Sequence, residues 1–312
     1  MLPIARWIGY GGETDFHGNV LETVTWAAGL AAHSKNIQVF ATVHTAFNHP
    51  IVVAKQLATL DQMSGGRLGL NVVAGWNKPE YDAFGIDLPG DHSDRYAMAQ
   101  EWFDYVQKLW TADTAFDWDG NFYQGKGVYS LPHPVQPKMP IINAAGSEEG
   151  RVFAMRNADF LFTPVFDFDQ AKATAADITE RAASVGRKVD VLTLCTVVCR
   201  PTQQEAEDYL NWYAEEQADW EAVDNLMTLQ GMHAQSFTPE ALALYRDRMA
   251  AGHGGFPLVG TPDTIADLLE KLSVAGIAGT TLAFVDYAKE FPYFRQEVLP
   301  RLEAKGLRQP VN

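Results

Sequence analysis

The sequence predicts an α/β fold built on a parallel sheet. Short apolar segments typical of buried strands alternate with segments of helical periodicity along most of the chain. The apolar segments are nearly continuous, which is typical of strands covered on both faces. Such a sheet is either open and doubly wound or closed as a (β/α)8 barrel, and the pattern alone leaves both architectures open.

The expected strands fall one short of the common barrel size. Counting a short apolar stub at residues 2–5 with the complete strands brings the total to seven, whereas closure of the common barrel needs eight. The complete strands are expected over residues 37–43, 67–73, 140–145, 159–165, 189–199 and 279–285.

Several of the expected helices have marked ends. Asn19 and Glu22 predict a capping box at the start of a helix that reaches residue 34. Pro50 and Gly65 mark the two ends of the next helix. Further helices are expected over residues 93–110, 147–157, 170–186, 202–229, 261–276 and 287–305, with Thr261 as an N-cap residue.

Two segments interrupt the alternation of strands and helices. Residues 112–138, rich in aromatic residues and proline, predict a hairpin and a crossing loop, and residues 203–258 predict a helical insertion. Nothing in the composition indicates a linker, so one domain spanning residues 1–312 is expected.

Charge and composition limit the partners of this protein. Its net charge is -15 and no basic run exceeds two residues, which argues against nucleic acid and anionic membranes. The sequence contains no apolar run of 18 residues and no recognisable signal peptide, so the cytoplasm is the default expectation. Cys195 and Cys199 lie four apart in one expected strand, too far apart to form a disulfide, and are expected to be buried thiols.

Ligands of parallel α/β folds bind at the carboxyl ends of the strands. Asn71 is an amide inside an apolar strand, and two readings of it are evenly balanced: a structural amide, or a hydrogen-bonding group aimed at a flat polar ring. Ser147 opens a helix, either as a plain N-cap or as part of an anion site. The remaining residues selected by this rule are Thr42, His44, Trp76 and Asp286.

Common catalytic and metal-binding motifs are absent from the sequence. His44 and His49 lie five apart, but neither an HExxH motif nor a third local ligand accompanies them, so no metal site is expected. Walker, GxGxxG and GxSxG motifs are also missing.

Four long segments together resemble the bacterial-luciferase-like flavin monooxygenases, in the branch of the pyrimidine, dimethyl sulfone and alkanesulfonate enzymes. The segments are "GGETDFHGNVLETVTWAAGLAAHSKNIQVFATV", "HPIVVAKQLATLDQMSGGRLGLNVVAGWNKPEYDAFG", "HSDRYAMAQEWFDYVQKLW" and "LVGTPDTIADLLEKL". The resemblance implies a (β/α)8 TIM barrel, which in this chain would lack its first β-α unit. It also implies an enzyme that uses O2 and reduced FMN, supplied by a transient NAD(P)H-dependent flavin reductase, to oxygenate a small organic substrate.

The resemblance also implies roles for individual residues. The FMN contacts of the family fall on Ala5, Arg6, Asn71, Glu80, Arg95, Tyr96 and Ser147. Leu2, Thr42 and Asn71 match positions that line the oxygen side of the flavin ring. His44 is either a hydrogen-bond donor or base for the substrate, or a capped surface histidine. The helical insertion at 203–258 is the candidate lid, and the apolar stretch "VTWAAGLAA" favours a homodimer or a dimer of dimers.

Two other functions fit the same resemblance. The chain could be a deazaflavin-dependent oxidoreductase of the same fold, which transfers hydride without oxygenation. Alternatively it could be a non-catalytic flavin-binding protein or a truncated homologue.

Overall fold

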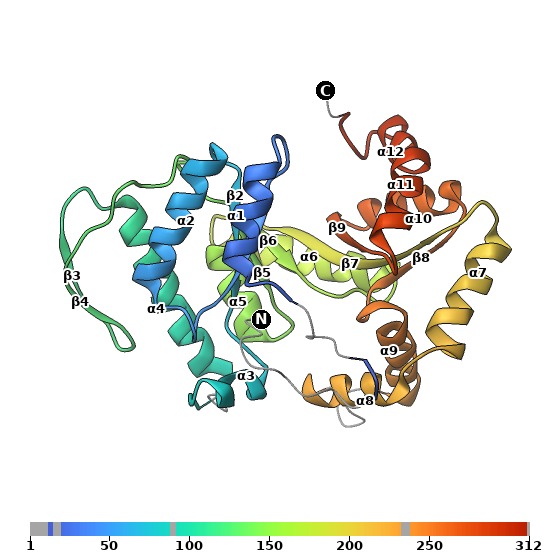
Figure 1. Cartoon of the computed structure of the whole chain (residues 1–312), viewed down its shortest axis with the longest axis horizontal. Coiled ribbons are helices and arrows are strands. Elements are labelled where there is room, and N and C mark those ends of the chain that lie inside the picture. The colour runs from blue at the N-terminus through green and yellow to red at the C-terminus, as the bar shows by residue number, and fades with distance from the viewer. Residues whose placement is uncertain (1–11, 15–19, 88–91, 232–237, 311–312) are drawn as a thin grey trace. The chain divides into compact units, whose positions relative to one another are not determined.

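The computed structural model describes residues 12–14, 20–87, 92–231 and 238–310. The chain divides into two compact units, one built from residues 20–161 and the other from residues 12–14 and 162–310. The helices and strands carry the labels of Figure 1.

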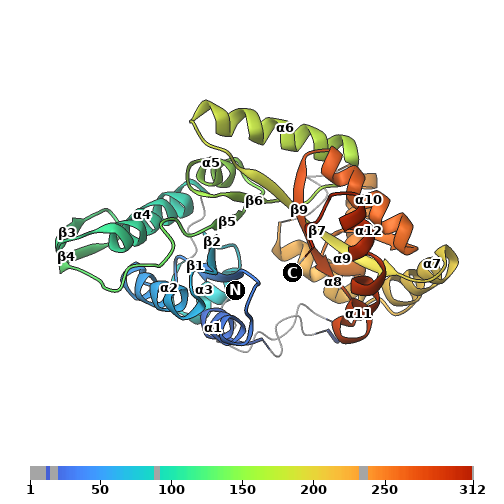
Figure 2. The ribbon, with the colours of Figure 1, turned by 90° about the horizontal axis from the view of Figure 1, so that it is seen from above.

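The first unit holds a parallel sheet flanked by helices. Its strands, in spatial order, are β1 (Val39–His44), β2 (Leu68–Val73) and β5 (Ile141–Ala144), and β6 (Phe160–Phe162) follows beside β5. Figure 2 shows α1 and α2 beside the first two strands. The helices of this unit are α1 (Thr23–His33), α2 (Pro50–Ser64), α3 (Lys78–Ala83), α4 (His92–Thr111) and α5 (Glu148–Asn157).

The ends of the first two helices test the capping predictions. α2 begins at Pro50 and ends before Gly65, which has the left-handed φ of 65° that glycine favours, so this prediction is confirmed. The predicted capping box of α1 is wrong. Glu22 is itself the N-cap residue, and its carboxylate accepts the N–H groups of Val24 and Thr25 at 3.0 and 2.7 Å. Because the Glu22 carboxylate reaches both N–H groups, the helix begins at Thr23, later than the sequence pattern suggested. Asn19 lies outside the described residues.

The predicted hairpin is confirmed by antiparallel strands β3 (Phe116–Asp119) and β4 (Gln124–Val128). The Glu101 carboxylate on α4 accepts the N–H groups of Asn121, Phe122 and Tyr123 in its turn, at 2.8 to 3.2 Å. Because one carboxylate satisfies three backbone donors, the hairpin is tied to α4 at its tip.

The second unit centres on strand β7 (Asp190–Cys199), which lies between β8 (Phe256–Gly260) and β9 (Ile277–Ala283). Cys195 of β7 is paired with Phe256 on one edge and with Leu282 on the other. Both Cys195 and Cys199 are buried and free, as predicted. The helices of this unit are α6 (Phe168–Ser184), α7 (Gln203–Asn211), the π-helical turn η1 (Trp212–Glu216), α8 (Trp220–Leu229), α9 (Pro239–Gly252), α10 (Pro262–Val274), α11 (Tyr287–Glu297) and α12 (Leu299–Ala304).

Two predictions in the second unit need correction. The helical insertion expected at 203–258 ends in a strand that was not predicted: β8 begins at Phe256, because its backbone pairs with the end of β7. The last helix, expected over residues 287–305, is divided at Val298 into α11 and α12, with a proline in the first turn of the latter.

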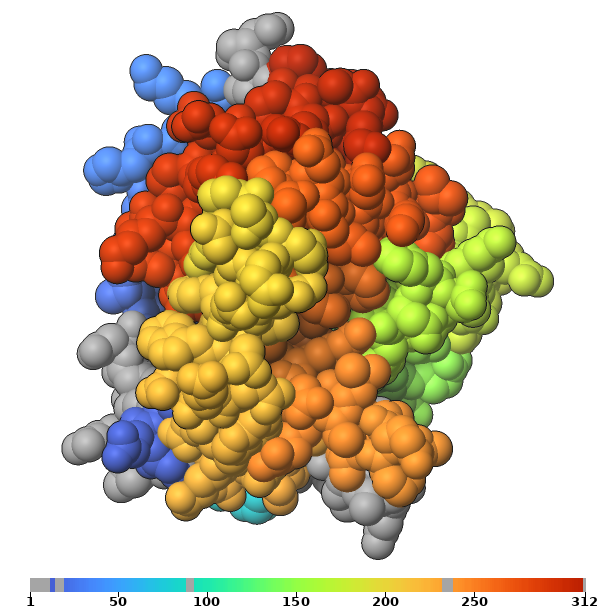
Figure 3. Space-filling view, turned by 90° about the vertical axis from the view of Figure 1, so that its right-hand side faces the viewer, coloured from blue at the N-terminus to red at the C-terminus, as the bar shows by residue number. Residues whose placement is uncertain are grey.

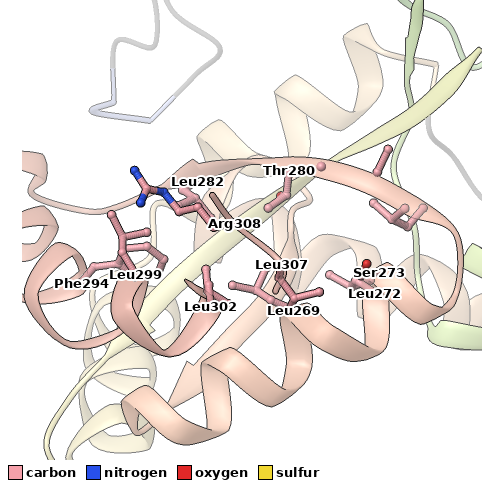
Figure 4. A pocket seen from close by; sticks show the side chains of 13 residues that line it. Leu269, Leu272, Ser273, Thr280, Leu282, Phe294, Leu299, Leu302, Leu307 and Arg308 are labelled. Carbon is pink, nitrogen blue, oxygen red and sulfur yellow. The ribbon is translucent and has the colours of Figure 1, made fainter. Parts of the chain in front are cut away.

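An apolar cavity of about 240 Å³ lies between α10, β9 and the last two helices (Figure 4). Leucine and phenylalanine side chains such as Leu272, Phe294 and Leu302 line it, and Arg308 stands at its edge. Within the part of the chain that the structure describes, no helix combines the length and the apolar character needed to cross a bilayer.

Arg67 joins the helices and strands of the first unit through its guanidinium group. It donates to the carbonyls of Ala31 and Ser34 at the end of α1, of Ser64 at the end of α2, and of Ile37 before β1, at 2.8 to 3.0 Å. Its own carbonyl accepts the N–H of Val39, the first residue of β1, at 2.9 Å. These bonds fix the start of both strands relative to both helices.

We predict that Arg67→Lys destabilises the fold by about 3 kcal/mol, because an ammonium group lacks the fork that reaches several carbonyls. Urea unfolding followed by circular dichroism measures the change in the free energy of unfolding. Arg156→Lys, on an exposed position of α5, is the matched control and should change it by less than about 0.5 kcal/mol. Equal stability of the two variants would show that the Arg67 network is dispensable.

Candidate active site

Thr42 and Asn71 lie side by side at the carboxyl ends of β1 and β2. The register pairs them directly, and the amide Nδ2 of Asn71 donates to Thr42 Oγ1 at 3.2 Å. The amide oxygen Oδ1 of Asn71 is buried and has no hydrogen-bond partner among the described residues. The hydrogen bond to Thr42 orients the amide, so that Oδ1 is left as an acceptor for a ligand.

The face of the sheet that carries Asn71, here called the Asn71 face, is built in layers. Paired residues of parallel strands point to the same side, so Phe40, Thr42 and Ile142 share this face with Asn71. A Cβ atom on Gly69 would lie 2.3 Å from the Phe40 ring. Glycine at this position therefore lets the Phe40 ring lie across the sheet below the Thr42–Asn71 pair, as an apolar floor.

A second amide, Asn143 in β5, lies on the opposite face of the sheet because it pairs with Val72. Its Nδ2 donates to the Val72 carbonyl at 2.8 Å, while its Oδ1 is buried without a partner among the described residues. Asn143 was not among the predicted site residues. The signal was nevertheless the same as for Asn71, an amide inside an apolar strand.

The Tyr96 phenol and Ser147 both lie at the first turn of α5. Ser147 Oγ accepts the N–H of Gly150 at 3.2 Å, which confirms that Ser147 is an N-cap. A Cβ atom on Gly150 would stand 2.5 Å from the Tyr96 phenol oxygen, so glycine is what lets this phenol approach the turn. Burial raises the pKa of Tyr96, and the nearby Arg95 charge opposes the rise. The phenol is therefore a proton donor at neutral pH.

Arg95 and Glu80 lie around the loop that follows β2. Arg95 is buried and donates to the Gly75 carbonyl at 3.0 Å, and its Nε has no partner among the described residues. Burial raises the pKa of Tyr81 to about 12, and the charges of Arg95 and Glu80 act on it in opposite directions. Gly75 has a φ of 106° and is packed against Tyr81, so this loop needs glycine for both conformation and space.

His44 lies inside an aromatic cluster rather than on the surface. Its ring stacks on Phe47 at 4.2 Å and meets Tyr81 edge-on at 5.4 Å, and 3% of the residue is exposed. The surface alternative of the sequence analysis is therefore wrong, since the loop and α3 cover the ring. Nδ1 accepts the N–H of Ala46 at 3.3 Å, which places the proton on Nε2, beside Gly75.

Burial lowers the pKa of His44 to about 3. The imidazole is neutral at physiological pH and is a poor base there. Of the two roles toward the substrate, base or hydrogen-bond donor, a neutral His44 favours donation through Nε2. Nε2 has no hydrogen-bond partner among the described residues.

The structure places the remaining predicted residues in different ways. Trp76 is half-buried in the loop after β2, and Leu2, Ala5 and Arg6 lie outside the described residues. Two buried polar residues that sequence reasoning missed, Thr45 and Asn77, also carry side-chain atoms without partners among the described residues. No local sequence pattern predicted that Thr45 and Asn77 are buried, because α3 and the aromatic cluster around His44 cover them.

The parallel sheet, with polar groups gathered at the carboxyl ends of β1, β2 and β5, has the arrangement typical of an α/β enzyme. The chain matches the model of the luciferase-like monooxygenase family over residues 5–279, and it belongs to that family. The family, the fold and the monooxygenase class predicted from the sequence are confirmed.

One curated relative and two solved structures are similar to this chain. The pyrimidine monooxygenase RutA of Escherichia coli O127:H6 is 33% identical over 98% of this chain and 85% of its own length. DmoA from Hyphomicrobium sulfonivorans has a similar fold, with a TM-score of 0.82 at 23% identity over 93% of this chain and 72% of DmoA. Riboflavin lyase RcaE, solved with modified FMN and riboflavin, gives a TM-score of 0.80 at 22% identity over 93% of this chain and 75% of RcaE.

We predict that His44→Gln reduces the loss in the free energy of unfolding when the pH falls below 7. The unfolded chain protonates His44 near pH 6.5, whereas the folded chain does so only near pH 3, so stability is full above 6.5 and falls as the pH drops. Between pH 7 and 5 the wild type should lose about 2 kcal/mol more than the variant. Urea unfolding at both pH values measures this difference, and parallel profiles would contradict a buried neutral imidazole.

Proposed function

We propose that this chain is the oxygenating component of a two-component flavin-dependent monooxygenase. It would use O2 and reduced FMN from a separate NAD(P)H-dependent flavin reductase to oxygenate a small pyrimidine-, sulfone-, sulfonate- or amide-like molecule. The observation that carries the proposal is the unpaired Oδ1 of Asn71, oriented by Thr42 on the Asn71 face. Membership in the luciferase-like monooxygenase family supports the reaction class.

The residues present fit a flavin mononucleotide. An unpaired amide oxygen at Asn71 suits an N–H group of the flavin ring, and Arg95 has a buried Nε without a partner among the described residues. Ser147 and the first turn of α5 offer backbone N–H groups to a phosphate, and the Tyr96 phenol lies against the same turn. Glu80 would contact the ribityl chain of FMN. Leu2 would line the oxygen side of the flavin ring, and Ala5 and Arg6 would contact FMN. All three lie outside the described residues.

When bound, reduced FMN supplies the two electrons that let one oxygen atom of O2 enter the substrate while the other leaves as water. Thr42 and Asn71 are uncharged and are held in place by their mutual hydrogen bond. They would line the oxygen side of the flavin ring without placing an acidic group there. His44 would donate from Nε2 to a substrate acceptor, and Trp76 would form an apolar wall. The segment at about 203–258, of which residues 232–237 lie outside the described residues, would act as a lid that excludes water.

Exposed apolar residues on and before α1 support the proposed homodimer. Leu21, Trp26 and Leu30 are 60%, 51% and 37% exposed, although all three are large apolar side chains. Burying them against a second copy would remove this surface from water.

Labelled-oxygen incorporation tests the proposed function. The protein, a generic flavin reductase, NADH, FMN and isotopically labelled O2 are incubated with a panel of pyrimidines, sulfones, sulfonates and amides. Mass spectrometry should find one labelled oxygen atom in a product, and Asn71→Ala should lower its yield by about tenfold with unchanged circular dichroism. Binding of reduced FMN without incorporation would indicate a flavin-binding protein. Turnover with a reduced deazaflavin alone would indicate the hydride-transfer alternative, and either result contradicts the proposal.

Two substitutions of Ser147 separate its capping role from its proposed phosphate contact. Ser147→Ala should cost about 1 kcal/mol of stability, because the bond to the Gly150 N–H is lost. Ser147→Asp keeps an N-cap acceptor but adds a negative charge, so FMN should bind at least about tenfold more weakly. Riboflavin, which lacks the phosphate, is the control and should bind Ser147→Asp like the wild type. Calorimetric titration measures both, and unchanged FMN affinity in Ser147→Asp would contradict the contact.

A further inference from the structure

We propose that the second unit holds a binding site for an uncharged planar aromatic compound. The site is a cavity of about 850 Å³ where the chain leaves the carboxyl ends of β7 and β9. Tyr209 and Trp212 form one wall and Tyr287 and Tyr293 the other. The proposal uses none of the residues assigned to FMN, although Tyr209 and Trp212 belong to the segment proposed as a lid.

The walls of this cavity, here called the aromatic cavity, expose large rings to solvent. Trp212 is 50% exposed and Tyr287 is 59% exposed, on helices that face the same cavity. On the molecular face in Figure 3, the yellow surface of α7 and η1 borders the red surface of the C-terminal helices. Exposed aromatic rings gathered around one concave surface are typical of a ligand site, because a stacked ligand would remove them from water.

The position of Trp212 comes from an unusual piece of backbone. Trp212 opens the π-helical turn η1, which follows α7 without a break and closes with a bond from the N–H of Gln217 to the Trp212 carbonyl at 3.0 Å. A π turn inserts an extra residue into the helical repeat and redirects the side chains that follow, and such turns are frequent at functional sites. The next residue, Tyr213, donates its hydroxyl to the Ala251 carbonyl at 2.9 Å, which holds the turn in place.

The opposite wall is held by hydrogen bonds as well. Glu290 Oε2 accepts the N–H groups of Val285 and Asp286 at 3.1 and 3.4 Å. Tyr287 donates its hydroxyl to the Leu282 carbonyl at 3.2 Å, so its ring is fixed although it is exposed. A ligand would therefore meet rings that are already oriented, with little side-chain entropy to lose.

The charges around the aromatic cavity cancel in pairs. Arg200 forms an ion pair with Glu290 at 2.7 Å, and Lys289 forms one with Asp286 at 2.9 Å. The Arg200 guanidinium also lies over the Tyr209 ring, 4.0 Å from its centroid. Because each cation is paired with a carboxylate, the cavity favours an uncharged ligand over an anion or a cation, and its exposed aromatic rings favour a flat one.

Fluorine NMR with a neutral fluoroquinoline as the probe tests this site on the full chain. The wild type should shift or broaden the fluorine signal in a saturable way, and a non-planar fluorocyclohexanol should bind at least about tenfold more weakly. Trp212→Ala and Tyr287→Ala should each weaken fluoroquinoline binding by about tenfold or more, because each removes one stacking surface.

Tyr129→Ala is the matched control, since Tyr129 is 45% exposed in the other unit and lies outside the aromatic cavity. It should bind the probe like the wild type. Circular dichroism and FMN titration of Tyr287→Ala, which lies outside the proposed lid, should match the wild type. This separates loss of this site from loss of the fold or of the flavin site. Absence of saturable binding to the wild type, full affinity in Trp212→Ala, or equal loss in Tyr129→Ala would overturn the proposal.

Discussion

The register between β1 and β2 is the constraint on which the candidate active site depends, and Arg67 sets it. Its carbonyl accepts from Val39 while its guanidinium binds carbonyls at the ends of α1 and α2. With Val39 opposite Leu68, Thr42 stands opposite Asn71 three residues later. A slip of one residue would turn Asn71 to the helix-covered face and end its hydrogen bond with Thr42. Arg67, at the start of β2, thus decides which polar groups lie side by side near the carboxyl ends of the two strands.

The carboxyl ends of the strands in the first unit hold polar groups that the protein itself leaves unsatisfied. Asn71 Oδ1 and Arg95 Nε are buried without partners among the described residues. Each such group costs about 1–3 kcal/mol in a folded chain that offers it no hydrogen bond. Their concentration at the ligand end of the sheet is what a binding site requires, because the same groups regain their bonds when a polar ligand arrives.

Much of this arrangement was predictable from local patterns, and the exceptions have specific causes. The strand of Asn71, the N-cap Ser147 and both ends of α2 follow from apolar runs, a serine before a helix, and proline and glycine at fixed places. β8 was missed because five residues after a glycine-rich turn become a strand only by pairing with β7. Asn143 repeats the amide signal of Asn71 and was within reach of the same reasoning.

The sequence by itself determined the alternation of strands and helices, the family, and the identity of most residues proposed to bind FMN. Tertiary structure alone decided how those residues are used. It buried His44 against Phe47 and Tyr81, which lowers its pKa and keeps the ring neutral. It also oriented the Asn71 amide through Thr42, 29 residues away in the chain. The physical reason is that hydration and hydrogen-bond partners depend on neighbours distant in sequence, which no local pattern of residues specifies.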